Sequence, residues 1–346
     1  MKILFLSYNF YPDIGGIEIN SEILAGYFNK FGAEIRLITN SQISTNDDKV
    51  FPYPIIRKPN NFELVKQHLW ADVIFENNPS LNLSWPTIIT SKKKVIAIRT
   101  WISRMDGSLI FQDKLKLWGL NKADAVIAVS NKVKELTFKN AIVIGNPYRV
   151  DLFKNFGVEK NKDFVFLGRL VSDKGADMAI NLLRLLIENN KSKNYTLTII
   201  GDGPEKMNLH KIVAKYNLEM YISFTGILKG KSLVEILNQH KYILVPSRWR
   251  EPFGNVALEG MACGCLPIVS DDGGLIDAIG DAGISFERNN EKSLFEKVKY
   301  LLENPDLERF IRKRFNDHLI NHHPEVVAKK YYDVILSVYK SDCIDN

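Results

Sequence analysis

The chain has 346 residues, of which 45% are hydrophobic and 25% charged, and this is the composition of a globular protein long enough for two domains. No apolar run reaches the ~18–20 residues of a membrane span, the apolar start of the chain is too short for a signal peptide, and 3 cysteines make no disulfide framework, so we expect a cytoplasmic protein. The net charge of +6 lies entirely in residues 1–160, where 21 Lys and Arg face 15 Asp and Glu.

Short, continuous apolar runs alternate with longer amphipathic stretches along the whole chain. In the first half the predicted strands are 2–7, 34–39, 72–76, 95–100, 125–130 and 141–145, and helices are predicted over stretches such as 17–31 and 113–120. In the second half the predicted strands are 164–168, 197–201, 222–225, 242–246, 266–270 and 283–286, with a predicted helix over 174–188. Continuous apolar strands are typical of parallel sheets buried on both faces. The sequence therefore predicts an α/β protein with two Rossmann-like, doubly wound parallel-sheet domains.

A polar linker near residues 150–163 marks the boundary between the two predicted domains. We place the first domain at 1–155 and the second at 156–323. The chain ends in a last predicted helix over 324–340, which follows the second sheet in sequence and could pack on either domain.

The segment Arg248–Glu259 carries two glutamates on either side of a predicted helix start. Glu251 falls in the loop after a strand, and Glu259 falls roughly 7 Å along the helix that begins after Gly254. Free N–H groups at a helix start favour an anion such as a diphosphate. One elongated ligand could place hydroxyls at both glutamates and phosphates between them. A nucleotide sugar has this layout. Both glutamates could also be solvated carboxylates, although Glu259 lies among apolar residues and would need partners there.

In each predicted domain, a glycine-containing loop follows the first strand. Gly15-Gly16 would let a phosphate approach the backbone, but a plain tight turn is the simpler interpretation. Arg169 and Lys174 lie five residues apart after a strand, so both cations could reach one diphosphate. The alternative is two solvated surface cations. No D-x-D motif or convincing carboxylate pair is present, so no metal is implied.

These motifs, in this order, resemble those of the retaining glycosyltransferases of family 4, which have the GT-B architecture. The residues that carry the resemblance are Gly15-Gly16, Gly168-Arg169-Leu170 with Lys174-Gly175, Gly201-Asp202-Gly203-Pro204, Glu251-Pro252-Phe253-Gly254 with Glu259, and Met261-Ala262-Cys263-Gly264 with Pro267-Ile268-Val269. The resemblance implies two domains that face a central cleft, with the last helix packed back on the first domain.

The resemblance also implies a role for each site residue. Arg169 and Lys174 would bind the diphosphate together with the Gly15-Gly16 loop, and Glu251 would contact the donor sugar. Glu259 would hold the ribose. The remaining implied donor contacts are the backbone near Phe253, Gly254 and Asn255, and the base-binding residues Ile227 and Leu228. The implied reaction is a metal-independent transfer with retention, without a cofactor, to a glycan, a lipid-linked or another glycoconjugate acceptor, as in surface polysaccharide or lipopolysaccharide assembly.

The sequence departs from the family at one position on the acceptor side. Family members often have a histidine after the fourth strand of the first domain, where this chain reads Ile98-Arg99-Thr100-Trp101-Ile102-Ser103-Arg104-Met105-Asp106-Gly107. Trp101, Arg104 and Asp106 are the candidate replacements. The first domain's one histidine, His68, is expected on a helix surface.

Two other functions remain open from the sequence. One is a catalytically silent sugar-nucleotide-binding partner of a synthase, and the other is a sugar-nucleotide epimerase of the same architecture. The basic first half could attract an anionic acceptor or an acidic membrane face, or be an ordinary solvated surface. Residues 109–118 mix apolar and basic side chains, so peripheral membrane contact is one interpretation and a helix packed on the first sheet is the other. Nucleic acid is not an expected partner, because no known binding motif accompanies the charge.

Overall fold

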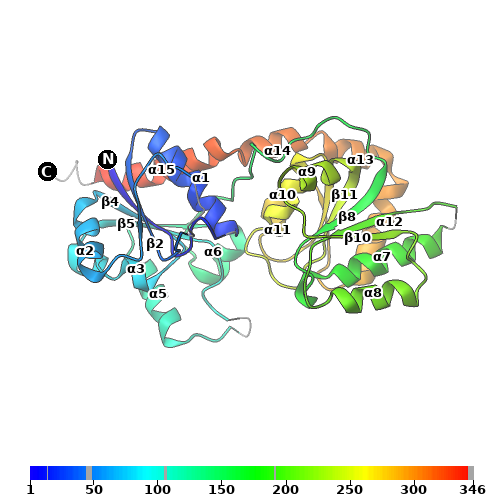
Figure 1. The fold of residues 1–346 in the computed structure, drawn as a ribbon, viewed down its shortest axis with the longest axis horizontal. Coiled ribbons are helices and arrows are strands. Elements are labelled where there is room, and N and C mark those ends of the chain that lie inside the picture. Colours follow the sequence, from blue (N-terminus) through cyan, green and yellow to red (C-terminus); the bar gives the residue numbers. More distant parts are fainter. Residues whose placement is uncertain (14, 44–48, 105–106, 191, 342–346) are drawn as a thin grey trace. The chain divides into compact units, whose positions relative to one another are not determined.

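The computed structural model describes residues 1–13, 15–43, 49–104, 107–190 and 192–341. These residues form two compact units (Figure 1). The first unit is Met1–Pro147 with the C-terminal helix α15, and the second is Tyr148–His323. No helix in the described ranges is long and apolar enough to cross a membrane.

The first unit contains a seven-stranded parallel sheet in the order β3-β2-β1-β4-β5-β6-β7. Its strands are β1 (Lys2–Leu6), β2 (Glu34–Thr39), β3 (Ile55–Arg57), β4 (Val73–Asn77), β5 (Lys93–Ile98), β6 (Ala125–Ala128) and β7 (Ile142–Val143). Its helices are α1 (Gly16–Lys30), α2 (Asn61–Trp70), α3 (Leu81–Ser84), α4 (Thr87–Thr90), α5 (Phe111–Asn121), α6 (Asn131–Thr137) and α15 (Pro324–Ser341).

The second unit contains a six-stranded parallel sheet in the order β10-β9-β8-β11-β12-β13. Its strands are β8 (Lys162–Leu167), β9 (Leu197–Ile200), β10 (Ile222–Gly226), β11 (His240–Val245), β12 (Leu266–Ser270) and β13 (Ile284–Phe286). Its helical segments are the 3-10 turn η1 (Ser172–Lys174), α7 (Ala176–Asn189), α8 (Lys206–Lys215), α9 (Gly230–Gln239), α10 (Asn255–Ala262), α11 (Leu275–Ile279), α12 (Glu291–Glu303), α13 (Pro305–Arg312) and α14 (Phe315–Asn321).

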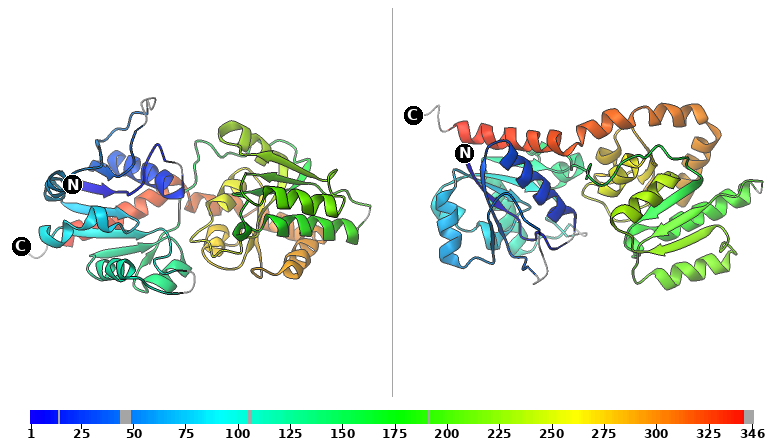
Figure 2. Two further views of the ribbon diagram at one scale, coloured as in Figure 1. Left: turned by 60° about the horizontal axis from the view of Figure 1, so that its bottom comes forward. Right: turned by 45° about the horizontal axis from the view of Figure 1, so that its top comes forward.

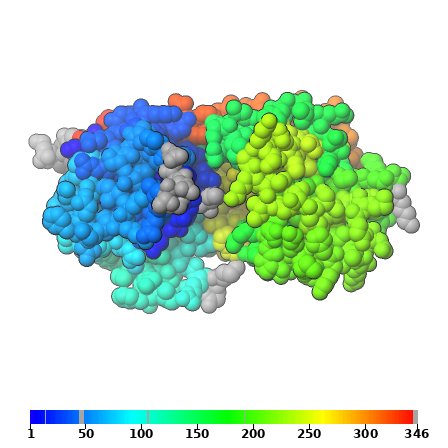
Figure 3. Space-filling view, viewed as in Figure 1, coloured from blue at the N-terminus to red at the C-terminus, as the bar shows by residue number. Residues whose placement is uncertain are grey.

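Both sheets are covered by helices on both faces, which explains why their strands are continuously apolar. In β1, Phe5 packs in one core cluster with residues of α1 and α15, while Leu4 packs in the other with residues of α2. Figure 2 shows α1 and α15 side by side against the first sheet. In the space-filling view α15 (red) is visible only along the upper margin, because atoms of α1 and its neighbours lie in front of it (Figure 3). The predicted α/β class with two Rossmann-like units is confirmed.

The predicted strands are all present, with ends displaced by at most two residues. The strand β3 was not predicted, because it has only three residues and follows two prolines, Pro52 and Pro54. The predicted helix over 174–188 begins later than expected, since Lys174 belongs to η1 and Gly175 has a left-handed φ of 72°.

The structure places the division between the units eight residues before the predicted boundary at 155, between Pro147 and Tyr148. Phe153 is buried in a core cluster of the second unit together with Val165 and Ile243. Asn238 fixes the same segment, since its Oδ1 accepts from Phe156 N at 2.7 Å. The polar composition of this segment concealed its role in packing.

The predicted surface role of His68 is wrong. Its side chain is fully buried in α2, with Nδ1 lying 2.8 Å from the carbonyl oxygen of Leu64. Burial lowers the pKa of His68 to about 4, so the ring is neutral at physiological pH. His68 is therefore part of the helix-to-sheet packing of the first unit.

Candidate active site

The parallel strands of the second unit bring the loops at their carboxyl ends to one edge of the sheet. The loops after β8 and β11 carry Arg169 and Glu251, and the loop after β10 carries Ile227. Open α/β sheets bind their ligands at this edge, because loops from neighbouring strands converge there. The structure thus brings the predicted donor-site residues of the second unit to one edge of one sheet.

Glu251 and Lys174 form an ion pair at this edge. Lys174 Nζ donates to Glu251 Oε1 at 2.5 Å, and Ser247 Oγ donates to the same oxygen at 3.0 Å. The side chains of Lys174 and Glu251 are only 20% and 14% exposed, so the pair is held in a fixed geometry rather than moving freely in solvent. Lys174 Nζ also lies 5.1 Å from the ring centre of Trp249, a favourable cation–π distance.

A glycine allows the Lys174 loop to lie directly against the Glu251 loop. A Cβ at Gly175 would lie 2.0 Å from the carbonyl oxygen of Pro246, so a larger residue would push the two loops apart. Backbone N–H groups of Arg248 and Trp249 donate to the carbonyl oxygen of Asp173 at 2.7 and 3.1 Å. These contacts fix the separation of Lys174 and Glu251, which lie 77 residues apart in the sequence.

A second pair of glycines supports the Glu251 loop from its other side. The N–H of Gly274 donates to the carbonyl oxygen of Glu251 at 2.8 Å. A Cβ at Gly273 would lie 2.3 Å from that same oxygen, and a Cβ at Gly274 would lie 2.2 Å from the carbonyl oxygen of Pro252. The Glu251 loop is therefore held between the loops that follow β8 and β12.

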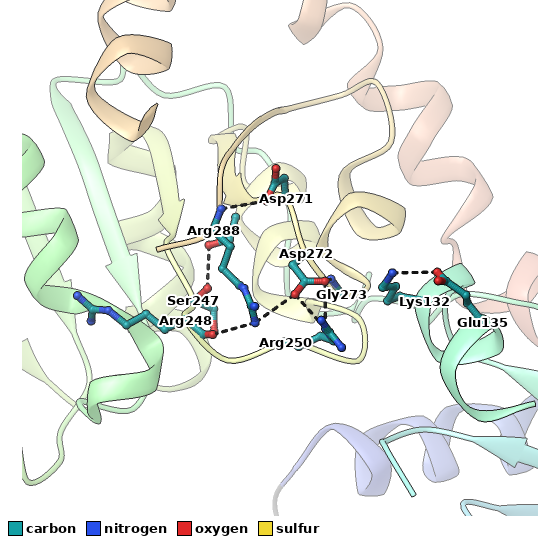
Figure 4. Close-up of polar contacts among 10 residues, drawn as sticks. Lys132, Glu135, Ser247, Arg248, Arg250, Asp271, Asp272, Gly273 and Arg288 are labelled. Carbon is teal, nitrogen blue, oxygen red and sulfur yellow. Dashed lines mark hydrogen bonds and ion pairs between the residues drawn. The ribbon is translucent and has the colours of Figure 1, made fainter. Parts of the chain in front are cut away.

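Figure 4 shows the charged contacts that surround this loop. Asp272 accepts from Arg250 Nε at 2.9 Å and pairs with Arg288 Nη1 at 3.1 Å. Burial raises the pKa of Asp272, but hydrogen bonds from Arg250 and from the N–H of Gly273 outweigh burial and lower it below its usual value. The side chain of Arg248 points the other way (Figure 4). It pairs with Asp177 through both of its terminal nitrogens at 2.6 Å. These pairs fix the two arginines that precede Glu251 in its loop.

The helix α10 begins directly after the Glu251 loop, as predicted. Its first residue, Asn255, follows Gly254, whose φ of 129° and close approach to Leu275 exclude a side chain. The side chain of Phe253 is 3% exposed, and its ring lies 5.6 Å from that of His322. Only the backbone of Phe253 can therefore contact a ligand, while the start of α10 provides the amide-rich end that favours phosphate.

Glu259 lies within α10 and is half-buried among apolar residues. Burial raises the pKa of Glu259 to about 7, although the nearby cation of Arg149 acts in the opposite direction. A buried carboxyl group is stabilised by hydrogen bonds with neutral hydroxyls, such as those of a ribose.

Arg169 differs from Lys174 because its side chain is exposed and has no hydrogen bond or ion pair within the described ranges. The loop that carries it is nevertheless fixed. The N–H of Leu170 donates to the carbonyl oxygen of Asp202 at 3.0 Å. Cβ atoms at Gly201 and Gly203 would lie 1.9 and 2.4 Å from carbonyl oxygens of the Arg169 loop. The Gly201-Asp202-Gly203 motif is thus a structural turn that supports the Arg169 loop.

Ile227 and Leu228 follow β10 at the same edge. Ile227 is 66% exposed, whereas Leu228 is half-buried and packs against the core of the second unit. An exposed apolar side chain on a supported loop is suited to contact a flat ring. No cluster of three or more His, Cys, Asp or Glu side chains suited to a metal ion occurs in the part of the chain that the structure describes.

The other predicted site residues belong to the first unit. Gly15 caps α1 in an extended conformation, and a Cβ there would lie 2.3 Å from Glu18 Oε2, so the glycine provides space for that carboxylate. After β5, Trp101 is half-buried and Arg104 is exposed. The N–H of Arg104 donates to the carbonyl oxygen of Ser108 at 3.1 Å. Asp106 lies outside the described residues.

Sequence reasoning missed a buried polar cluster at the carboxyl edge of the first sheet. Arg99 is 5% exposed, and its guanidinium donates to Asn77 Oδ1 at 2.6 Å and to the hydroxyl of Tyr331 in α15 at 2.8 Å. A pair of asparagines directly after a buried strand, Asn77-Asn78, was the available signal, but it matches no motif of the family.

Residues 149–317 match the family model "Glycosyl transferases group 1". The chain is similar to this family over these residues, which make up most of the second unit. An uncharacterized glycosyltransferase of Methanocaldococcus jannaschii is 27% identical over 336 residues, covering 89% of this chain and 90% of the relative. The N-acetyl-alpha-D-glucosaminyl L-malate synthase of Bacillus anthracis is 23% identical, covering 96% of both chains. Anabaena HepE, solved in complex with UDP, is 17% identical with a TM-score of 0.81 and covers 97% of this chain and 100% of its own.

These similarities confirm the predicted GT-B fold and glycosyltransferase family. These similarities support transfer of a sugar from a nucleotide sugar.

Proposed function

We propose that the protein is a retaining, metal-independent glycosyltransferase that moves a sugar from a nucleotide-diphosphate sugar to a glycan, a lipid-linked or another glycoconjugate acceptor. The observation that carries this proposal is the arrangement of Glu251, Lys174 and Arg169 at one sheet edge beside the start of α10. Two cations and a helix N-terminus provide the charge that a departing diphosphate requires.

In this proposal the donor rearranges the ion pair that the structure shows. The diphosphate takes Lys174 and Arg169 as its partners, because a charge-assisted contact to phosphate competes with the Glu251 carboxylate. Glu251 can then accept hydrogen bonds from hydroxyls of the donor sugar. Ser247, which also donates to Glu251, holds the carboxylate in place during this exchange.

The chemical step breaks the bond between the anomeric carbon and the phosphate oxygen and forms a bond from the same face to the acceptor oxygen. The acceptor's proton passes to the departing phosphate, so no separate base is needed. Lys174 and Arg169 stabilise the negative charge that develops on the leaving phosphate. Attack from the face that the leaving group vacates gives retention of configuration.

The nucleotide contacts follow the same sheet edge. We assign the ribose hydroxyls to Glu259 and the base to Ile227 and Leu228. HepE was solved with UDP, which makes UDP-sugars the first donors to test. An acceptor in surface polysaccharide or lipopolysaccharide assembly is the class that the resemblance favours.

Peripheral contact with the cytoplasmic face of a membrane is a further part of the proposal. Helix α5 buries Leu120 but leaves Phe111, Leu115 and Trp118 exposed at 73%, 37% and 48%. Lys114 lies on the same helix. Exposed aromatic and aliphatic side chains beside basic ones are typical of surfaces that contact anionic lipid.

The experiment that tests the reaction is incubation with a panel of UDP-sugars, with and without acceptors, followed by NMR of the product. Release of UDP together with a new glycoside of unchanged anomeric configuration supports the proposal. An inverted product contradicts retention, an altered nucleotide sugar without acceptor indicates an epimerase, and tight binding without turnover indicates a silent binding partner. Undiminished activity after exhaustive chelation of divalent cations supports independence from metal.

A further inference from the structure

The first unit contains a cavity of ≈ 340 Å³ that the site described above does not use. It opens beside Tyr8 and Asn9, which follow β1, and beside Asn77 and Asn78 at the end of β4. β1 and β4 are neighbours in the sheet although β2 and β3 lie between them in the chain, so the strand order reverses at this point. Open α/β sheets bind ligands at such a reversal, because the flanking loops diverge and leave a crevice.

The wall of this cavity is rigid. Glu76, which is 1% exposed, accepts from the N–H of Ser80 at 2.5 Å and pairs with Lys94 Nζ at 3.1 Å. The N–H of Asn78 donates to the carbonyl oxygen of Ala97 at 2.9 Å. The segment from Asn77 to Ser80 is thereby fixed to the end of β4 and to the neighbouring strand β5.

The buried guanidinium of Arg99 orients the amides of this wall. Its Nε donates to Asn77 Oδ1 at 2.6 Å, while Asn77 Nδ2 donates to Ser21 Oγ at 2.6 Å. Nη1 of Arg99 donates to the hydroxyl of Tyr331 at 2.8 Å, so α15 supports the same cluster. The backbone N–H of Arg99 donates to Asn78 Oδ1 at 3.1 Å, and the amide nitrogen of Asn78 is therefore not needed for this contact.

Several polar side chains at the cavity have no partner among the residues that the structure describes. Within the described ranges, the side chains of Tyr8, Asn82, Gln112 and Lys116 make no hydrogen bond or ion pair, although all four line the cavity. Asn78 has a φ of 80°, a left-handed conformation that non-glycine residues adopt mainly where function or packing requires it. Among the described residues that line the cavity there is no Asp or Glu.

From these observations we infer that the cavity binds the terminal sugar of a hydroxyl-rich glycan, neutral or carrying a negative charge. Amide groups both donate to and accept from sugar hydroxyls, and Lys116 is placed to contact a carboxylate. A cationic amino sugar would meet Lys116 with no carboxylate to compensate. A volume of ≈ 340 Å³ lies near the lower end of the ~300–1,000 Å³ of ligand pockets, which suits one or two sugar rings.

The role of the cavity as the acceptor subsite rests on the proposed glycosyltransferase function, whereas the binding of a sugar does not. Gln112 and Lys116 of α5 line the cavity, while Phe111, Leu115 and Trp118 of the same helix are exposed. One helix thus carries both the cavity wall and the surface that we assign to the membrane, an arrangement that suits a glycan attached to a lipid.

Saturation-transfer NMR on the full chain, with three sugars as probes, tests the inference. We expect saturation of methyl α-D-glucopyranoside and of glucuronic acid, and little of protonated glucosamine. Asn82→Ala and Asn78→Gly should each weaken the binding of methyl glucoside about fivefold, the effect of one lost hydrogen bond. Glycine adopts left-handed backbone readily, so Asn78→Gly removes the amide without straining the loop.

Lys116→Glu tests the charge preference. It should reverse the order of glucuronic acid and glucosamine, while Lys114→Glu, on the same helix but away from the cavity, should leave the order unchanged. Absence of saturation for all three probes, or binding that neither Asn82→Ala nor Asn78→Gly weakens in variants that keep the wild-type melting temperature, would overturn the inference. Equal binding of glucosamine and glucuronic acid to the wild-type protein would overturn the charge assignment.

Hydrolysis of a UDP-sugar without acceptor, measured on the same samples, separates this inference from the proposed function. Donor hydrolysis without sugar binding in the cavity contradicts the inference and leaves the transferase function standing. Sugar binding in the cavity without donor hydrolysis or transfer contradicts the transferase function and leaves the binding site standing.

Discussion

At the carboxyl edge of the second sheet the polar side chains are charged and form ion pairs, whereas at the same edge of the first sheet they are mostly amides and hydroxyls. Lys174 and Glu251 represent the first kind, and Asn77 and Asn78 the second. Both sheets are parallel and reverse their strand order beside the first strand of the unit. The comparison teaches that one topology can serve two ligand chemistries, a diphosphate that needs cations and a sugar that needs hydrogen bonds.

The largest effect is expected from Glu251→Gln at the carboxyl edge of the second sheet, which we call the charged edge. The amide keeps the shape but loses the charge that pairs with Lys174, so we expect kcat to fall about 100- to 1,000-fold. Steady-state kinetics with a UDP-sugar that the wild-type enzyme uses as a donor measures this change in kcat. The matched control is Glu188→Gln, which removes an exposed partner of Arg184 in α7 and should leave kcat unchanged. A Glu251→Gln enzyme with wild-type kcat would remove this residue from the mechanism.

Arg169→Ala sharpens the comparison by removing the cation that has no protein partner in the described ranges. We expect kcat/KM for the donor to fall roughly 30- to 300-fold, or about 2–3 kcal/mol, because one charged contact to the diphosphate is lost. Folding stability should stay within about 0.5 kcal/mol of wild type, since the side chain is exposed. Donor turnover at the wild-type rate would contradict the diphosphate assignment.

The pH dependence of stability tests the burial of Glu259. A carboxyl group with a pKa of about 7 in the folded protein keeps its proton after the unfolded chain has lost it. Stability is therefore expected to fall as pH rises from about 4.5 to 7, by at most about 3 kcal/mol. Glu259→Gln should remove this fall in urea unfolding measured across that range.

Burial lowers the pKa values of His68 and His240 to about 4. These two groups have the opposite effect, because they make the folded protein less stable as the pH falls. Only the difference between wild type and Glu259→Gln isolates the carboxyl group. Parallel stability profiles for the two proteins would show that the pKa of Glu259 is close to its usual value.

Gly175→Ala tests whether loop contact holds the charged edge together. A Cβ there would lie 2.0 Å from Pro246 O, so we expect a loss of about 2 kcal/mol of stability beyond the backbone strain, together with reduced donor turnover. Gly157→Ala is the control, since Gly157 also has a left-handed φ, 69°, but a Cβ there would meet no atom within 4 Å. Equal melting temperatures for the two variants would disprove the loop clash.

The smallest effect is expected at the surface of α5. Phe111→Ser should weaken sedimentation with anionic liposomes several-fold, because one exposed aromatic ring contributes about 1–2 kcal/mol to interfacial burial. Phe62→Ser in α2, also exposed, is the comparison variant. Absence of liposome binding by the wild-type protein at low salt would remove membrane contact from the proposal.

The alternation of apolar runs and amphipathic stretches determined both parallel sheets and most of their helices, because continuous burial on two faces imposes apolar strands. The spacing of Glu251 and Glu259 across the start of α10 was likewise readable, since a strand, a glycine and a helix follow one another locally. Short elements such as β3 (Ile55–Arg57) escaped this reasoning because three residues carry too little pattern.

Only the tertiary structure decided which distant residues meet. The ion pair of Lys174 with Glu251 joins positions 77 residues apart, and the contact of Arg99 with Tyr331 joins positions 232 residues apart. Burial of His68 and the cavity beside Asn78 also depend on how helices cover the sheet. Local sequence sets the form of each element, whereas side-chain partners follow from packing between elements, and no local pattern encodes them.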